Sequence, residues 1–302
     1  TVPENRAWAL PYLALVLNAL VWGVSWWPLR ELQGEGLHPL WSSAATYLLG
    51  AVAMLCFMPK VLGEFVQHKA LWLLALAAGT TMVGFNWGVS IGEVIRVVLL
   101  FYLMPIWAVL LARLILKEPI TGRALIRVAL AFAGAVLLLS PNGTLGFPVP
   151  SNLAETLGLM GGAAFALNNI LLRHQAERTA QARLFAMFVG GVVAPAAVAA
   201  GLAVWLGEGN SIVQWPVSPG LYGGVVLLGF TVSLLVANYG LQYGASRLPA
   251  NVTSVVMLSE VVFATLSAIL LTNEVLTPQV GIGGAMILLA AALSALESRD
   301  AH

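Results

Sequence analysis

Few side chains in this sequence carry charge within an apolar environment, and Glu260 is the most prominent of them. It is the only acidic residue in the middle of a long apolar stretch. A carboxylate placed in hydrocarbon costs about 2.5 kcal/mol or more, so this one must face protein or water. Three roles are open to it: coupling of a proton, contact with an amine, or a structural hydrogen bond.

Uncharged polar residues form a second group of candidate binding residues. Asn86 and Ser90 are four residues apart, as are Asn238 and Gln242, so each pair lies on one helix face. Asn168 and Asn169 add a third polar patch. Each amide alone could simply bond two helices together. Because the two pairs recur in corresponding parts of the chain, we interpret them as the lining of a cavity.

Aromatic residues deep within apolar stretches could form the wall of a binding pocket, and packing against lipid or other helices is the competing interpretation. These residues are Trp22, Trp87, Tyr102, Trp107 and Tyr239.

Two prolines and one arginine also stand out. Pro105 and Pro195 each interrupt an apolar stretch and predict a helix break there, although proline is also common in membrane helices without such a role. Arg96 lies near the start of its stretch. It can extend to lipid headgroups or point into a vestibule toward a carboxylate.

The elements that position these residues are predicted from composition and hydropathy. The chain is 60% apolar and 9% charged, with a mean hydropathy of +0.90, against about 45–50% and 25% in soluble domains. The sequence therefore predicts an all-α integral membrane protein. A net charge of +1 gives no basic surface for nucleic acid, and the single cysteine allows neither a disulfide nor a thiolate metal site.

A membrane-spanning helix needs about 20 mostly apolar residues, and ten stretches meet this requirement. They are residues 8–29, 39–58, 70–91, 94–116, 123–140, 152–172, 183–206, 218–243, 249–271 and 278–296. The sequence thus predicts ten transmembrane helices.

The two halves of the chain repeat one pattern. Asn86-Trp87-Gly88 returns as Asn238-Tyr239-Gly240, and the corner at Glu118 returns at Glu274. An odd number of helices per repeat places the second copy upside down relative to the first. We expect two inverted five-helix repeats at residues 1–140 and 152–302, joined by a linker at 141–151.

Glycines spaced four residues apart predict close contacts between helices. Gly84, Gly88 and Gly92 have this spacing, as do Gly240 and Gly244. Small residues at such positions allow two helix backbones to approach each other.

The distribution of charge predicts the orientation. If both termini are cytoplasmic, only Arg30 and Arg96 of the 14 Lys and Arg residues lie outside, as the positive-inside rule requires.

No catalytic site is expected. Asp300 is the only aspartate, every histidine lies in a loop or the tail, and no nucleotide-binding loop occurs. We therefore expect no enzyme activity, metal or cofactor.

The sequence resembles the drug/metabolite transporter superfamily, and within it the ten-helix family with two EamA domains. The resemblance covers about residues 10–296. It depends on the Asn-aromatic-Gly steps, on Leu103-Met104-Pro105 and Leu258-Ser259-Glu260-Val261, and on the corners at 116–121 and 272–277. Val261 and Met104 depart from the family's Glu-Pro pattern.

The resemblance implies a multi-pass protein of the bacterial inner membrane that exports small neutral metabolites by alternating access. The aromatic-rich segments are similar to exporters of aromatic and other neutral amino acids. Export of hydrophobic cations and a channel-like pore are the alternatives. The expected partners are a small-molecule substrate and lipid, without nucleic acid, and a homodimer is left open.

Overall fold

The computed structural model describes residues 9–117, 119–139, 149–175, 177–207, 212–245, 247–248 and 250–297. Every regular element within these residues is a helix, which confirms the predicted all-α class. Glu118 of the first corner and residues 140–148 of the predicted linker lie outside the described residues.

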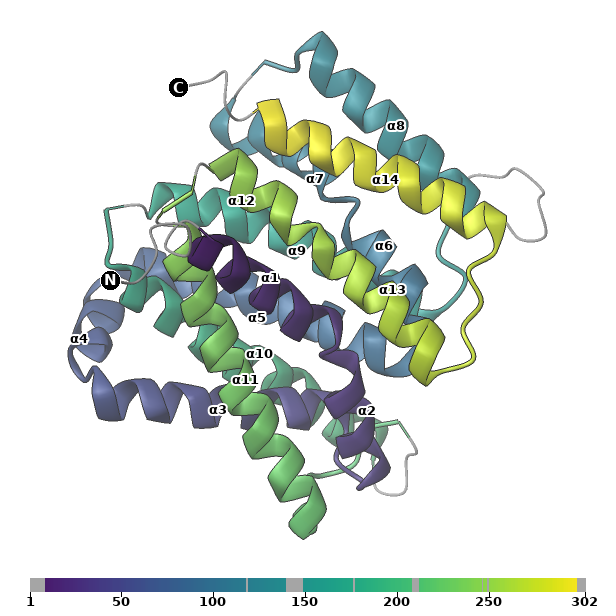
Figure 1. Cartoon of the computed structure of the whole chain (residues 1–302). Helices are drawn as coiled ribbons and strands as arrows, with labels where there is room; N and C mark the ends of the chain where they lie inside the picture. The colour runs from purple at the N-terminus through teal and green to yellow at the C-terminus, as the bar shows by residue number, and fades with distance from the viewer. Residues whose placement is uncertain are drawn as a thin grey trace, which may run out of the picture.

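Figure 1 shows the helices of the first half in purple to teal. They are α1 (Ala9–Gly23), α2 (Trp26–Gly34), α3 (Pro39–Phe57), α4 (Lys60–Gln67), α5 (Lys69–Ile91), α6 (Val94–Phe101), α7 (Met104–Leu111), the π-helical turn η2 (Ala112–Leu116) and α8 (Gly122–Leu139). The second half contains α9 (Leu153–His174), α10 (Ala180–Leu206), α11 (Leu221–Ala245), α12 (Ala250–Met257), α13 (Ser259–Leu271) and α14 (Pro278–Glu297).

Each predicted apolar stretch coincides with one helix or with consecutive helices. Seven such segments of the described chain are long and apolar enough to cross a membrane. Val255–Leu271 and Pro278–Leu293 are shorter apolar helices. The helix α9 is not among the seven, and it carries Glu155, Asn168 and Asn169. The count of ten crossings therefore remains a prediction, and α4 is a short helix that was not predicted.

Three of the apolar stretches are interrupted by a turn. Pro105 has no N–H to donate to the carbonyl of Phe101, and the chain turns at Tyr102 and Leu103 between α6 and α7. The matching turn between α12 and α13 falls at Leu258 without a proline, and the Ser259 hydroxyl donates to the carbonyl of Val256 there. Both halves thus interrupt this helix at the corresponding residue.

The third interruption lies between α1 and α2. Pro28 has no N–H for the carbonyl of Val24, which instead accepts a hydrogen bond from the Trp27 N–H at 3.1 Å.

The break predicted at Pro195 is not found, because α10 continues through this residue from Ala180 to Leu206. The proline removes one backbone hydrogen bond of the helix. The helix packs closely in the turn before the proline, since a Cβ at Gly190 would clash with the Ala75 carbonyl and one at Gly191 would lie 2.5 Å from the ring of Tyr47.

Helices far apart in the sequence pack closely through small residues. A Cβ at Gly84 on α5 would lie 2.6 Å from the Leu157 carbonyl oxygen of α9. A Cβ at Gly244 on α11 would lie 2.8 Å from the Pro11 carbonyl oxygen of α1. The predicted glycine stripes therefore mark the α5–α9 and α1–α11 contacts.

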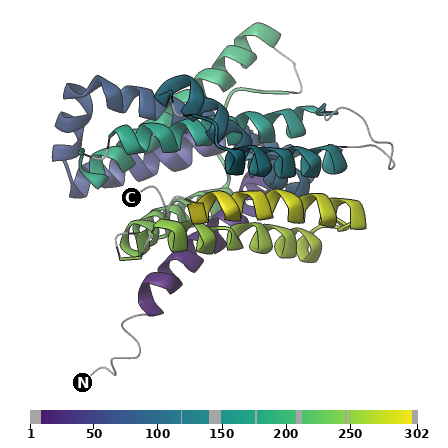
Figure 2. The same cartoon turned by 90° about the horizontal axis from the view of Figure 1, so that it is seen from above.

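The pair α8 and α14 lies at one edge of the molecule, as Figures 1 and 2 show. Gly134 and Gly283 face each other across it, and the Gln279 side chain donates to the Leu137 carbonyl at 2.6 Å. The remaining helices form the larger body that contains the cavity described next.

Candidate functional site

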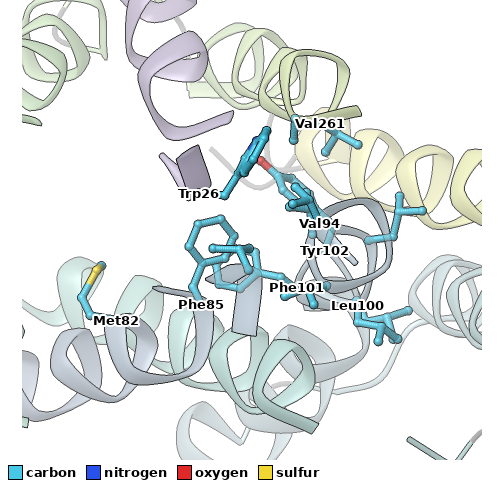
Figure 3. Packing of buried hydrophobic residues seen from close by; sticks show 14 of the residues in the cluster. Trp26, Met82, Phe85, Val94, Leu100, Phe101, Tyr102 and Val261 are labelled. Carbon is cyan, nitrogen blue, oxygen red and sulfur yellow. The ribbon is translucent and has the colours of Figure 1, made fainter. Parts of the chain in front are cut away.

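A cavity of about 460 Å³ is lined by residues of α1, α5, α6, α7, α9, α10, α11, α12, α13 and α14. Aromatic side chains make much of its wall: Trp22, Phe85, Phe101, Tyr102 and Phe165. Their rings contact one another, with centroids 6.3 Å apart for Trp22 and Phe85 and 4.9 Å for Phe85 and Phe101. Figure 3 shows Phe85, Phe101 and Tyr102 side by side in this cluster.

Flexible apolar side chains complete the wall. Met82, Met104, Met187 and Met257 line the cavity, which accounts for four of the eight methionines in the chain. The methionines come from four different helices, so they surround the space from several directions.

Glu260 is the only charged side chain among the described residues that line the cavity. It lies in the first turn of α13 and is 8% exposed. The Tyr102 hydroxyl, at the turn after α6, donates to its carboxylate at 2.9 Å. A helix N-terminus favours a nearby negative charge, and the tyrosine adds one hydrogen bond. The site therefore presents a carboxyl group to the cavity.

Three polar lining residues were not predicted: Asn18, Thr81 and Thr253. Asn18 on α1 is fully buried; its amide nitrogen donates to the Ala237 carbonyl at 2.8 Å, while its Oδ1 has no partner. The Thr253 hydroxyl on α12 is buried and also has no partner. A lone asparagine in the first apolar stretch was the signal available for Asn18. No comparable signal marked Thr253.

The structure brings some of the predicted site residues together at this cavity. Trp22, Tyr102, Pro105, Asn238 and Glu260 all line it. The Asn238 amide nitrogen donates to the Leu234 carbonyl of its own helix at 2.8 Å.

Other predicted site residues lie in helix contacts instead. The Asn86 amide donates to the Ser43 hydroxyl at 3.0 Å, and the Ser90 hydroxyl donates to the Asn86 carbonyl at 2.6 Å. The Trp87 ring packs edge-on against His38, with centroids 5.4 Å apart. These three residues are buried outside the cavity, because Gly84 and Gly88 direct the neighbouring face of α5 against α9.

Four further predicted residues are placed away from the cavity lining. Tyr239 is 71% exposed, because the adjacent Asn238 and Gly240 face the molecule and Tyr239 points outward. Gln242 is half-buried on the same helix. The Trp107 ring nitrogen and the Asn168 amide atoms are buried without partners. The cavity therefore contains a smaller and partly different polar set than predicted.

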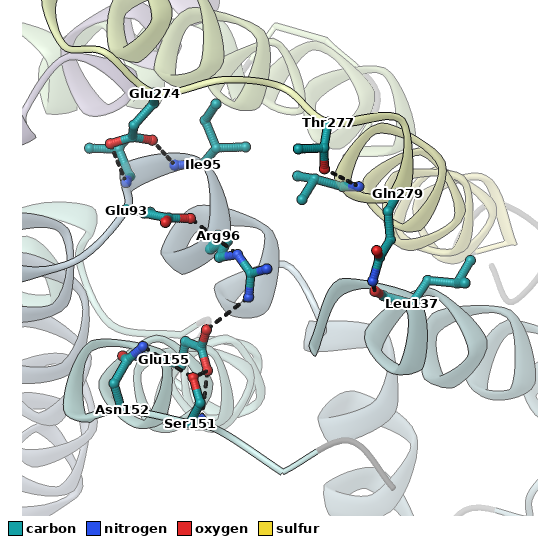
Figure 4. A network of polar contacts seen from close by, with 12 residues as sticks. Glu93, Ile95, Arg96, Leu137, Ser151, Asn152, Glu155, Glu274, Thr277 and Gln279 are labelled. Carbon is teal, nitrogen blue, oxygen red and sulfur yellow. Dashed lines mark hydrogen bonds and ion pairs between the residues drawn. The ribbon is translucent and has the colours of Figure 1, made fainter. Parts of the chain in front are cut away.

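A polar cluster lies at the opposite end of the helices, around a second cavity of about 1280 Å³. The Glu274 carboxylate accepts the backbone N–H groups of Val94 and Ile95, at 2.9 and 3.1 Å, and so caps the start of α6. Figure 4 shows this cap beside the ion pairs of Arg96. The Arg30 guanidinium donates to the carbonyls of Val89 and Gly92 in the same region.

Arg96 belongs to this cluster. Its guanidinium lies 3.0 Å from the Glu155 carboxylate and 3.1 Å from that of Glu93. Glu155 is buried and also accepts the N–H and hydroxyl of Ser151. Two roles were considered for Arg96, extension to lipid headgroups and contact with a carboxylate. In the structure, Arg96 contacts carboxylates.

A buried hydrogen bond joins α2 to α13. The Trp26 ring nitrogen donates to the Ser267 hydroxyl at 3.0 Å, and both residues are buried. Among the described residues, no group of three or more His, Cys, Asp or Glu could hold a metal ion.

Residues 9–140 match the EamA-like transporter family. No curated protein matches the chain. A solved structure titled "Crystal structure of protein" covers 97% of this chain and 98% of its own length, with a TM-score of 0.57 and 17% identity. At that identity the likeness concerns the fold alone, over nearly the whole chain.

Proposed function

We propose, from the match of residues 9–140 to a family of membrane transporters, that this multi-pass membrane protein is a secondary transporter. It exports small neutral metabolites, above all aromatic and other neutral amino acids, by alternating access through the cavity at Glu260. The observation that carries this proposal is the cavity itself. It is lined by aromatic and methionine side chains and holds a few polar groups.

We infer that the chain forms two inverted repeats with ten crossings, and one pattern of helix contacts supports this part of the proposal. When each helix is replaced by its counterpart in the other half, the α5–α9 contact becomes the α11–α1 contact, and the α10–α5 contact becomes the α3–α11 contact. The contacts α8–α14 and α10–α3 map onto themselves. Such symmetry is typical of transporters whose two halves rock about a central site.

The orientation follows from charge. With both termini cytoplasmic, Arg30 and Arg96 and their carboxylate partners lie at the outer end. The cavity then extends from the middle of the membrane toward the cytoplasm, past Asn169 on α9 and Met187 on α10. This arrangement corresponds to an inward-facing state that is ready to load substrate from the bacterial cytoplasm.

Export of hydrophobic cations is the second candidate function. It is favoured by one observation: the only charged lining residue of the described cavity is the carboxylate of Glu260, surrounded by aromatic rings. Aromatic faces and a carboxylate together attract a delocalised cation.

The test is uptake into proteoliposomes of labelled phenylalanine, leucine and one lipophilic cation, with and without a pH gradient. We expect saturable amino-acid flux. Unlabelled substrate on the same side as the label should inhibit this flux by competition, and unlabelled substrate on the opposite side should accelerate it by counterflow. Flux of the cation alone would establish the second candidate, and flux without saturation or counterflow would indicate a pore.

The same assay tests proton coupling. Glu260 and Tyr102 are the titratable side chains of the described cavity lining. If Glu260 carries the coupled proton, Glu260→Gln flattens the dependence of flux on pH. A preserved pH profile in this variant would assign Glu260 to substrate contact or structure.

A further inference from the structure

We propose that Asn18, Thr253 and Glu260 form a subsite for a primary ammonium group, so that the cavity recognises its substrate by the amine end. This inference rests on the proposed function and narrows its substrate class. A carboxylate on the substrate is then tolerated but not required, and aromatic primary amines without one are ligands as well.

The free atom of Asn18 is a hydrogen-bond acceptor. The Ala237 carbonyl can only accept a hydrogen bond, so the amide nitrogen of Asn18 must be the atom that faces it at 2.8 Å. This fixes the orientation of the amide and leaves Oδ1 buried without a donor. An unsatisfied buried acceptor is costly. A ligand N–H that reaches Oδ1 would remove that cost.

The other two members also offer acceptors. The Glu260 carboxylate receives one hydrogen bond from Tyr102 and retains further lone pairs. The Thr253 hydroxyl is buried without a partner and can accept. The helices α1, α12 and α13, which carry the three residues, contact one another. An ammonium group has three N–H donors and a positive charge, which matches this set.

The lining of the cavity offers a carboxylate no cationic partner. Among the described residues, no lysine, arginine or histidine lines it. A carboxylate would also meet repulsion from Glu260. Trp22 and Phe101 instead offer ring faces to an aromatic body or to the cation itself.

The inference is tested by direct binding to the purified full-length protein. Labelled 2-phenylethylamine is the probe, and unlabelled 2-phenylethylamine, phenylalanine and 3-phenylpropionate compete with it. We expect the first two to displace the probe at least tenfold more effectively than 3-phenylpropionate. Failure of the amine to bind, or displacement by 3-phenylpropionate as effective as by the amine, would overturn the inference.

A matched pair of variants assigns the effect to the subsite. Thr253→Val and Thr46→Val each remove a buried hydroxyl that has no partner, but Thr46 lies on α3 outside the cavity. We expect Thr253→Val and Glu260→Gln to weaken binding of the amine at least threefold and tenfold, respectively, with Thr46→Val unchanged. Unchanged affinity in both cavity variants would refute the subsite.

Binding and flux separate the inference from the proposed function. Binding of the amine without flux of any substrate in proteoliposomes would support the subsite and overturn the transport proposal. Saturable flux of amino acids in a protein that does not bind the amine would support transport and overturn the subsite.

Discussion

In the proposed orientation, loss of the Glu274 carboxylate should open the outer end of the molecule. This side chain joins the corner before α14 to the start of α6 by accepting two backbone N–H groups, and its neighbour Arg30 lies 3.9 Å away. Removal of a helix cap costs about 1–2 kcal/mol. If only the outward-closed state makes this contact, Glu274→Ala raises the outward-open population roughly 5- to 30-fold.

A thiol at position 90 reports this change. Ser90 lines the second cavity, near the Glu274 cap, and is 7% exposed. Ser90→Cys, made together with Cys56→Ser, therefore places a single cysteine at this buried position. A membrane-impermeant maleimide is added from outside, and the labelling rate is measured. We expect the rate to rise about 5- to 30-fold in Glu274→Ala, in proportion to the open population.

Glu93→Ala is the control for general electrostatic effects. Its side chain is 66% exposed and pairs with Arg96 near the same cavity. Such exposed pairs contribute about 0–1 kcal/mol, so the labelling rate should change less than about fivefold. Equal rates in Glu274→Ala and its parent, with both proteins folded, would refute the role assigned to the cap.

Three further predictions concern packing, the cavity wall and pH. Gly84→Ala should lower the free energy of unfolding, measured by detergent titration, by about 1–3 kcal/mol, because its Cβ would lie 2.6 Å from α9 backbone atoms. Gly229→Ala should not lower it, because a Cβ there would meet nothing within 4 Å. Equal free energies of unfolding in the two variants would contradict this packing. Trp22→Ala should raise KM for flux about tenfold, since an aromatic contact is worth up to about 1.5 kcal/mol. Tyr239→Ala, on an exposed face, should change KM less, and the reverse order would contradict the cavity assignment. Burial lowers the pKa of His38 to about 4 from 6.5. The unfolded chain thus binds more protons between these values, so stability is full above pH 6.5 and falls toward pH 4. In His38→Asn the melting temperature should depend less on pH across that range. An unchanged dependence would mean that other groups cause the loss of stability in acid.

The sequence predicted the helices well because the features that indicate a helix are local and accumulate over many consecutive residues. Long apolar stretches and glycine spacing depend on neighbouring residues alone, and Gly84 and Gly244 do face partner helices. The interruption at Tyr102 was likewise predicted, because Pro105 removes a backbone donor by its own chemistry. The interruption at Leu258 was not certain from sequence, since Val261 keeps its N–H.

The composition of the cavity was less predictable, because it depends on how each helix is rotated. One residue along a helix turns the side chain by about 100°, so Asn238 faces inward while Tyr239 faces outward. The contact of Glu274 with the start of α6 could not be predicted either, because Glu274 and Val94 lie 180 residues apart in sequence. Asn18 was available as a lone polar residue but had no repeat partner to draw attention to it.

The four methionines of the cavity wall have a consequence for selectivity. Their unbranched thioether chains change shape at little cost, unlike the rings beside them. A ligand held at one polar end can therefore carry side groups of different bulk, since Met82, Met104, Met187 and Met257 adjust around them. Selection should be strict for the charged end of the ligand and permissive for its body.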